Sequence, residues 1–225
     1  MLVLFDVDGT LIQSTAIDAD VYARTFAAVF GTELPSTEWG TYLCATDRGV
    51  AEEAVRTLGL DPALIPEFQQ RFVAGLVLEA GTRGVEPVRG ARDVPHRLGE
   101  AGHTVALATG AWERAARVKL RAARIPVEGH LLVGSDAHVA REEIIREALQ
   151  RAGPAARRAV YVGDGVWDLR AARALRLPFV GVEPEGCGIL RGAGAASVVR
   201  DFQRFPEFLR ILEQAAPPSA ESTPG

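Results

Sequence analysis

Short apolar runs recur along the chain, and each is followed by turn-forming residues. Five are rich in valine, leucine or phenylalanine without strict alternation: LVLFDVDGT (2–10), TVALATG (104–110), HLLVGSD (130–136), AVYVGDG (159–165) and FVGV (179–182). Such runs are typical of strands buried on both faces. Amphipathic stretches follow three of them, at residues 112–125, 141–153 and 166–177. Because strands alternate with helices, the pattern predicts an α/β fold, a parallel sheet with helices on both faces.

One interval breaks this alternation. After the first strand about 90 residues pass before the second begins, whereas a simple crossover needs far fewer. Three amphipathic helical stretches separated by Pro and Gly fill the interval: AIDADVYARTFAAVFG (16–31), RGVAEEAVRTLGL (48–60) and LIPEFQQRFVAGLVLEAG (64–81).

The interval therefore predicts two structural units and a tail. We expect residues 14–85 to form a small all-helical unit and residues 1–13 with 86–214 to form a Rossmann-like core. Residues 215–225 are rich in Pro, Ser and Ala, so we expect a flexible tail there.

Composition and charge narrow the function classes. The 225 residues are 48% hydrophobic and 24% charged, which is typical of a globular protein, and the net charge of -4 does not indicate nucleic-acid or membrane-surface binding. Cys44 and Cys187 show no paired metal-ligand spacing and are expected to be free thiols. The N-terminus has no basic leader, and no segment reaches the roughly 18 apolar residues of a membrane span. We expect a cytoplasmic protein, monomeric or homodimeric, without nucleic-acid or membrane partners.

Polar residues follow the predicted strands at the edge where an open parallel sheet binds ligands. DVDGT could by itself be only a turn, because Asp-Gly is a strong turn signal. A second motif, VGDGVWD, weakens that interpretation, since Asp168 follows Asp164 by four residues and would face the same way on a new helix. The candidates after the first four strands are Asp6, Asp8 and Thr10, then Thr109 and Gly110, then Ser135 and Asp136, and finally Asp164 and Asp168.

Carboxylates that converge in a crevice of low dielectric constant repel one another, and a divalent cation relieves this repulsion. Oxygen-only ligands favour Mg²⁺, whose coordination is commonly completed by phosphate oxygens. The expected partner is therefore a small phosphorylated metabolite. In phosphoryl transfer an aspartate can be the nucleophile, and a second carboxyl two residues away can donate and then remove a proton.

DVDGT, ATG after the second strand and GDGVWD after a later one, in this order and spacing, resemble the motifs of the haloacid dehalogenase-like hydrolase superfamily. The resemblance extends from Leu2 to about Phe202, and the helical insertion matches a cap domain between the first two motifs. It implies that Asp6 is the nucleophile and Asp8 the general acid/base. It also implies that Thr109 and the amide of Gly110 hold the phosphoryl group.

The same resemblance implies a Mg²⁺ site formed by Asp6, Asp8, Asp164 and Asp168. Within it, Asp8 would offer its backbone carbonyl, and Asp168 would support the ion directly or through water. Thr10 and Gly110 are candidate substrate-binding residues beside it.

The third motif departs from the family, which usually presents a lysine there. Arg141 stands at the start of the helix after the third strand, where that lysine is expected, and we predict that it is the substitute. Arginine binds phosphate differently from lysine, because its side chain reaches further and its planar guanidinium presents a fork of donors. Lys119, the only lysine of the chain, is the rival cation.

A polar break between the helices of the insertion, CATDRG from Cys44 to Gly49, is a further candidate. Asp47 and Arg48 could enter the site and select the substrate, so Arg48 is a candidate substrate-binding residue. The alternative is an ordinary helix N-cap in which Thr46 or Asp47 accepts hydrogen bonds from free amides.

We therefore expect a Mg²⁺-dependent phosphatase that acts through an aspartyl phosphate and is similar to phosphoglycolate phosphatases. Asp8 argues against dehalogenation, and the absence of lysine from residues 14–85 argues against a phosphonatase. Two alternatives stay open: a sugar phosphomutase of the same superfamily, and a non-catalytic protein that binds Mg²⁺ and a phosphometabolite.

Overall fold

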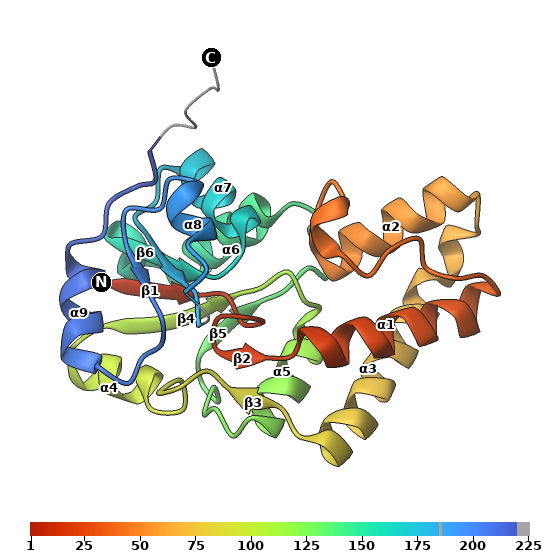
Figure 1. Cartoon of the computed structure of the whole chain (residues 1–225), viewed down its shortest axis with the longest axis horizontal. Helices are drawn as coiled ribbons and strands as arrows, with labels where there is room; N and C mark the ends of the chain where they lie inside the picture. Colours follow the sequence, from red (N-terminus) through yellow and green to blue (C-terminus); the bar gives the residue numbers. More distant parts are fainter. Residues whose placement is uncertain (185, 220–225) are drawn as a thin grey trace.

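A six-stranded parallel sheet forms the centre of the protein in a computed structural model, which describes residues 1–184 and 186–219 (Figure 1). Its strand order is β5-β4-β1-β6-β7-β8, so β1 lies between β4 and β6, at the point where the order reverses. The five predicted strands are confirmed, whereas β8 has only two residues and was not predicted. The strands are β1 (Leu2–Phe5), β4 (Thr104–Ala108), β5 (Leu131–Val133), β6 (Ala159–Gly163), β7 (Phe179–Val182) and β8 (Val198–Val199).

Helices cover both faces of this sheet, as predicted. The side chains of β1 explain why, since Val3 and Phe5 belong to one hydrophobic cluster, and Leu2 and Leu4 to another. The first cluster includes side chains of α4 (Val94–Glu100), α5 (Glu113–Ala122) and α9 (Phe205–Glu213). The second includes side chains of α6 (Arg141–Ala152), α7 (Val166–Leu175) and α8 (Ile189–Gly192), with η3 (Gly153–Arg157) after α6.

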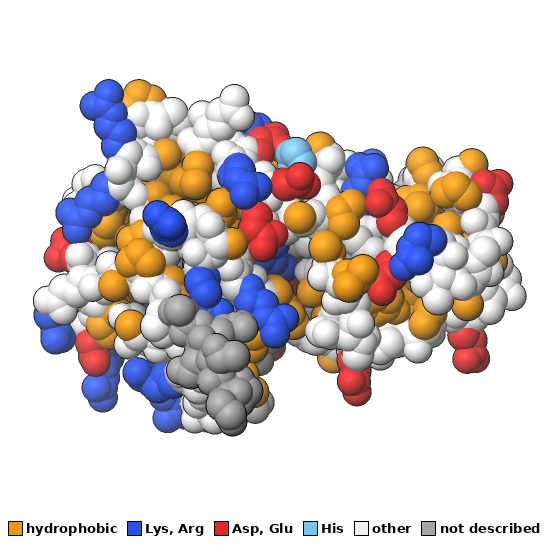
Figure 2. Space-filling model, turned by 90° about the horizontal axis from the view of Figure 1, so that it is seen from above, with side chains coloured by type: hydrophobic (Ala, Val, Ile, Leu, Met, Phe, Trp, Pro, Cys, Tyr) orange, Lys and Arg blue, Asp and Glu red, His pale blue; other side chains and the backbone are white. Residues whose placement is uncertain are grey.

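The helices between β1 and α4 form a helical region that projects from the body holding the sheet (Figures 1 and 2). It consists of α1 (Thr15–Phe30), η1 (Trp39–Thr41), α2 (Asp47–Leu58), η2 (Pro62–Leu64) and α3 (Ile65–Arg83). Two short antiparallel strands, β2 (Ile12–Gln13) and β3 (Glu86–Pro87), pair where the chain enters and leaves this region.

Aromatic packing joins the helical region to the body. Trp112, at the start of α5, is buried against Tyr22 of α1 and Phe72 of α3, with ring centroids 6.2 and 5.8 Å away. Burial of large aromatic side chains is a strong apolar contribution, so this contact holds α1 and α3 over the edge of the sheet.

Residues 215–219, the last that the structure describes, contact the body. The carbonyl of Ala216 accepts a hydrogen bond from the N–H of Phe179 at 3.1 Å, and Pro218 is buried. Residues 215–219 thus lie against the body, because the first residue of β7 needs an acceptor for its N–H. The rest of the expected tail, residues 220–225, lies outside the described residues. Every described helix is too short or too polar to cross a lipid bilayer.

Candidate active site

The turn after β1 carries two carboxylates to the carboxyl edge of the sheet. Asp6 is 2% exposed, and both Asp6 and Asp8 line a cavity of about 130 Å³. Gly9 adopts a φ of 79°, and a Cβ atom there would lie 1.9 Å from Oδ2 of Asp164. Glycine is therefore required both for the turn and for the close approach of Asp164.

Arg141 reaches this cavity from the first residue of α6. Its Nη1 lies 3.0 Å from Oδ1 of Asp6 and 2.9 Å from Oδ1 of Asp168, and its Nη2 donates to the carbonyl of Ala45 at 3.1 Å. A Cβ atom on Gly110 would lie 2.4 Å from Nη2, so the missing side chain makes room for the guanidinium. The structure thus brings Arg141 against Asp6.

Lys119 lies on the other side of the site. Its side chain is 1% exposed, and Nζ lies 2.7 Å from Oδ1 of Asp8 and 2.8 Å from Oδ2 of Asp18. Ser14 also donates a hydrogen bond to Oδ1 of Asp8. Asp6 and Asp8 therefore each have a cation of their own, and the two predicted rivals, Arg141 and Lys119, occupy different positions.

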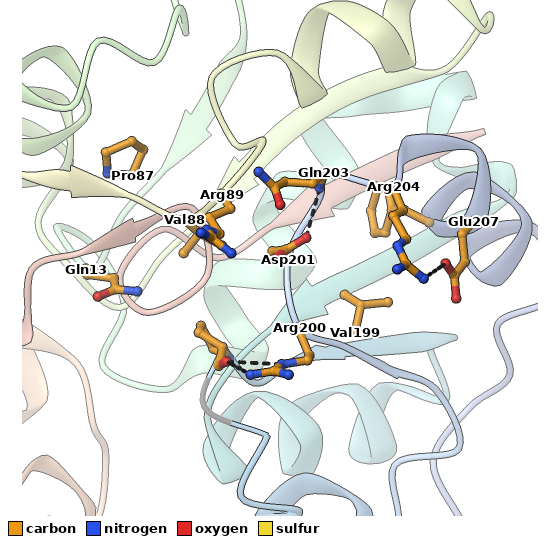
Figure 3. A pocket seen from close by; sticks show the side chains of 12 residues that line it. Gln13, Pro87, Val88, Arg89, Val199, Arg200, Asp201, Gln203, Arg204 and Glu207 are labelled. Atoms are coloured by element: carbon orange, nitrogen blue, oxygen red, sulfur yellow. Dashed lines mark hydrogen bonds and ion pairs between the residues drawn. The ribbon is translucent and has the colours of Figure 1, made fainter.

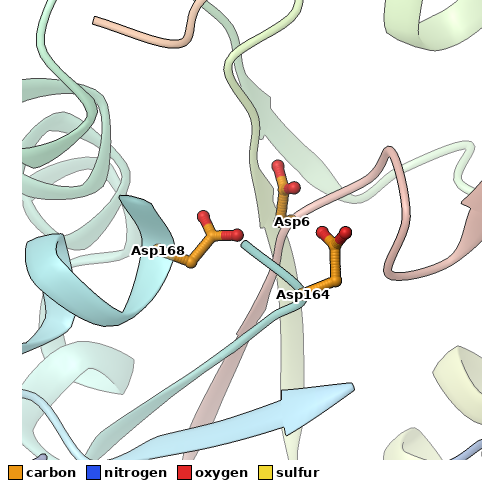
Figure 4. A group of neighbouring side chains, drawn as sticks. All are labelled: Asp6, Asp164 and Asp168. Atoms are coloured by element: carbon orange, nitrogen blue, oxygen red, sulfur yellow. The ribbon is translucent and has the colours of Figure 1, made fainter. Parts of the chain in front are cut away.

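The carboxylate of Asp6 converges with those of Asp164 and Asp168. One oxygen each from Asp6, Asp164 and Asp168 can lie within 4.8 Å of the others, and their side chains point into a common space (Figure 4). Asp168 is also held by the hydroxyl of Tyr161 at 2.7 Å and by the N–H of Gly165 at 2.9 Å. The carboxylate of Asp8 is not part of this group, because it is held by Lys119.

The ionisation of this group fits a site for a cation. Burial raises the pKa of Asp6 to about 7; Arg141 opposes that shift, and Asp168 and Asp8 add to it. Burial also raises the pKa of Asp164 well above its usual value, with Asp168 and Asp6 adding to the rise. Buried oxygen ligands that repel one another are the donor set a hard divalent cation prefers.

The other predicted residues lie at the same edge with different partners. Thr109 and Gly110 line the cavity, and the hydroxyl of Thr109 accepts from the N–H of Ala111 at 3.2 Å. Thr10 is buried, and its hydroxyl donates to Oδ1 of Asp164 at 3.2 Å. Thr10 is thus placed to orient an acidic side chain of the site.

The segment from Cys44 to Gly49 contacts the body. Thr46 is the N-cap of α2, since its hydroxyl accepts from the N–H of Gly49, and it also donates to the carbonyl of Val139 at 2.8 Å. The N–H of Asp47 donates to the carbonyl of Gly110 at 2.8 Å, its Oδ2 accepts from the N–H of Trp112 at 2.9 Å, and the residue lines the cavity. The segment is thus both a helix cap and part of the site.

Arg48, predicted to bind substrate, lies outside the residues that line the cavity. Its Nε donates to Glu52 at 2.6 Å, and Nη1 donates to the carbonyl of Asp136. Arg48 therefore holds α2 against the loop after β5.

Several residues that line the cavity were not predicted. Asp18 and Tyr22 come from α1, Trp39 from η1 and Trp167 from α7. The position of Asp18 carried a signal, because a carboxylate four residues before Tyr22 lies on the face of α1 that is otherwise apolar. The two tryptophans carried none, since no periodicity places them over the site.

A larger cavity of about 710 Å³ lies elsewhere, between β2, β3 and the segment after β8 (Figure 3). Its charged lining residues are mostly exposed or paired locally; Arg204, for example, lies 3.7 Å from Glu207. It contains none of the converging carboxylates, so the smaller cavity is the candidate active site.

The fold and this site define a class of protein. Residues 1–176 match the family model described as haloacid dehalogenase-like hydrolase, and the chain belongs to this family. A phosphoglycolate phosphatase of Xanthomonas campestris pv. campestris (strain 8004) is 32% identical over 186 residues, which cover 79% of this chain and 80% of the relative. One of Xylella fastidiosa is 31% identical over 185 residues, covering 78% and 77%. The chain is accordingly a phosphoric monoester hydrolase of this family.

Solved structures share the fold over nearly the whole chain. A hydrolase from Pseudomonas syringae superposes with a TM-score of 0.74 at 19% identity, covering 92% of this chain and 97% of that one. CbbY from Rhodobacter sphaeroides, in complex with phosphate, superposes with a TM-score of 0.73 at 23% identity, covering 94% and 98%.

Proposed function

We propose that this protein is a Mg²⁺-dependent phosphatase that hydrolyses a small phosphorylated metabolite through a phosphorylated Asp6. The proposal rests on the position of Asp6. This residue lines the cavity, and its carboxylate contacts Arg141 and lies beside the carboxylate of Asp164. The curated relatives named phosphoglycolate phosphatase support the type of reaction. In this proposal the helical region of residues 14–85 is the cap over a core made of residues 1–13 and 86–214.

The acidic group supports Mg²⁺ as the metal. Asp6 and Asp164 would hold the ion together with the backbone carbonyl of Asp8. Because both oxygens of Asp168 already accept hydrogen bonds, its part is to orient Arg141 and to support the ion through water. Bound Mg²⁺ would neutralise charge on the phosphoryl group and favour ionised Asp6 at neutral pH.

Two carboxylates divide the chemistry. Asp6 attacks the phosphorus, and the bond to the leaving alcohol breaks as protonated Asp8 gives its proton to the alcohol oxygen. A water molecule then attacks the phosphorus of phospho-Asp6 while Asp8 removes a proton from the water. Release of phosphate restores the Asp6 carboxylate and the protonated Asp8. Lys119 and Ser14 both contact Oδ1 of Asp8 and hold its carboxyl group apart from the acidic group around Asp6, which supports separate positions for the two carboxyl groups.

The phosphoryl oxygens need donors of fixed position. Thr109 and the amide of Gly110 would supply them, since both residues line the cavity. Arg141 would act in place of the lysine that the family resemblance leads one to expect, which its ion pairs with Asp6 and Asp168 support.

Hydrolysis of p-nitrophenyl phosphate by the wild type and by Asp6→Asn tests the proposal. The wild type should turn over with Mg²⁺ and lose activity with EDTA, and Asp6→Asn should lower kcat by at least about a thousand-fold while the circular dichroism spectrum is retained. Asp20→Asn, an exposed change on α1, is the matched control and should keep wild-type activity. Near wild-type turnover by Asp6→Asn would show that Asp6 is not the nucleophile.

A further inference from the structure

The helical region supplies the part of the cavity wall that would face the alcohol portion of a phosphate ester. Asp18 and Tyr22 of α1, Trp39 of η1, and Asp47 and Val50 of α2 line the same cavity as Asp6. Since Asp6 would bind the phosphoryl end, these side chains are the ones that the rest of the substrate meets.

This cavity is strongly acidic. Among the described residues that line it, Arg141 is the only cation, and the carboxylates are Asp6, Asp8, Asp18, Asp47 and Asp164. Arg141 is paired with Asp6 and Asp168, so two carboxylates share its single positive charge and it does not neutralise a further anionic group on the substrate.

Lys119, the buried cation behind this wall, is also paired with carboxylates. Nζ of Lys119 lies between Asp8 and Asp18, at 2.7 and 2.8 Å. A carboxylate on the substrate would have to compete with both aspartates for this ammonium group. It would also lie close to Asp47, and two carboxyl groups close together in a buried site are not both ionised without a further cost.

Asp18 carries a hydrogen-bond acceptor in this wall that has no donor among the described residues. The residue is 9% exposed, and its Oδ1 is a buried acceptor with no hydrogen-bond partner among the described residues. A buried carboxylate oxygen left without a donor is costly, so a donor arriving with the substrate would be favoured. The rings of Tyr22 and Trp39 add apolar walls that suit a short carbon chain or a cationic head.

We propose that the alcohol portion of the substrate is neutral or cationic, bearing hydroxyl or ammonium donors that Asp18 and Asp47 accept, and that esters bearing a carboxylate are selected against. This inference rests on the proposed phosphatase activity at Asp6. It separates the chain from enzymes for phosphoglycolate, whose alcohol portion carries a carboxylate.

Three phosphate esters with the same two-carbon skeleton test it: 2-hydroxyethyl phosphate, phosphoethanolamine and phosphoglycolate. We expect kcat/KM for the best of the neutral and cationic esters to exceed that for phosphoglycolate by at least about tenfold. Each ester is also measured as a competitive inhibitor of p-nitrophenyl phosphate hydrolysis, so that a slow substrate still yields a ranking.

Variants separate the wall from the chemistry. Asp47→Asn and Asp18→Asn should each bring the ratio of kcat/KM between 2-hydroxyethyl phosphate and phosphoglycolate closer to one, whatever they do to the absolute rate. Asp20→Asn removes a carboxylate from the exposed side of α1, where it pairs with Arg24 and Arg83, and should leave this ratio unchanged.

The outcomes distinguish this inference from the proposed function. Preference for phosphoglycolate, in rate or in inhibition, together with turnover of p-nitrophenyl phosphate, would overturn the inference and leave the phosphatase in place. Ratios that Asp18→Asn and Asp47→Asn leave unchanged would also overturn it. No turnover of any ester with Mg²⁺ would instead refute the phosphatase and the inference with it.

Discussion

Replacement of Lys119 by Met removes the cation that joins Asp8 of the body to Asp18 of the helical region. The side chain of Lys119 is 1% exposed, and its ammonium group contacts both carboxylates at 2.8 Å or less. Met fills a similar volume but leaves two carboxylates, with Asp47 nearby, without their buried counter-charge. Breaking a buried ion pair by removing one partner destabilises a protein by about 3–5 kcal/mol.

The expected loss is large enough to measure in two ways. The free energy of unfolding in urea should fall by about 3–5 kcal/mol. For a chain of this size each kcal/mol shifts Tm by roughly 2–4 °C, so Tm should fall by roughly 6–20 °C. Arg121→Met on the same helix is the matched control: its pair with Glu128 is 3.9 Å long and its side chain is 71% exposed, so the loss should stay below about 1 kcal/mol.

The pH dependence of this deficit tests its cause. Burial raises the pKa of Asp18 to about 6 even though Lys119 opposes the shift, and without the lysine it should rise further. Protonation at about pH 5 would then remove the unpaired charge, so the deficit should be smaller at pH 5 than at pH 8. Adding Asp18→Asn to Lys119→Met should recover part of the loss at pH 8. A deficit below about 1 kcal/mol, or one that does not change with pH, would refute this account of Lys119.

Three further predictions follow from the geometry of the site. Gly9→Ala should lower kcat at least about tenfold even with saturating Mg²⁺, because the new Cβ would displace Asp164. Gly31 also has a positive φ but has open space around it, so Gly31→Ala should lower the free energy of unfolding by only about 1 kcal/mol and leave activity unchanged. Arg141→Lys keeps the charge but loses the forked guanidinium that contacts Asp6, Asp168 and the carbonyl of Ala45, so kcat should again fall at least about tenfold. Arg146→Lys, an exposed change on the same helix, should have no effect. An Arg141→Lys variant as active as the wild type would refute the need for a guanidinium. Burial raises the pKa values of Asp6 and Asp47 to about 7 and that of Asp18 to about 6, so between about pH 4 and pH 7 the folded protein holds protons that the unfolded chain has released. Without metal, its Tm should therefore fall as pH rises from about 4 to about 7. A Tm that rises across this range would contradict the raised pKa values of these three aspartates.

The sheet could be predicted from sequence because its strands are buried on both faces. Runs such as residues 2–5 and 159–163 are apolar throughout, and turn residues end each of them. The shorter elements could not: β8 has two residues, and α8, with four, is too short to show a helical period. The packing of residues 215–219 depends on an N–H of β7 that composition does not reveal.

The candidate site could be predicted where strand ends determine position. Asp6, Asp164 and Arg141 follow a strand or begin the next helix, so the parallel sheet brings them to one edge. The wall from the helical region could not be predicted, because its position over the sheet depends on packing between distant segments, such as Trp112 against Tyr22. Arg48 illustrates the same limit. Its pair with Glu52 is an i,i+4 contact within α2, but its hydrogen bond to the carbonyl of Asp136 in the loop after β5 depends on the fold.

Arg141, which we propose in place of the family's lysine, fits its surroundings closely. The longer guanidinium of Arg141 needs space that a side chain at residue 110 would occupy, and Gly110 leaves that space open. The segment before α2 then supplies the carbonyl of Ala45 as an acceptor for Nη2. A chain that had merely lost its lysine would not be expected to provide both. Since Nη1 still contacts the carboxylate of Asp6, these adaptations favour a working phosphatase over a protein that only binds phosphate.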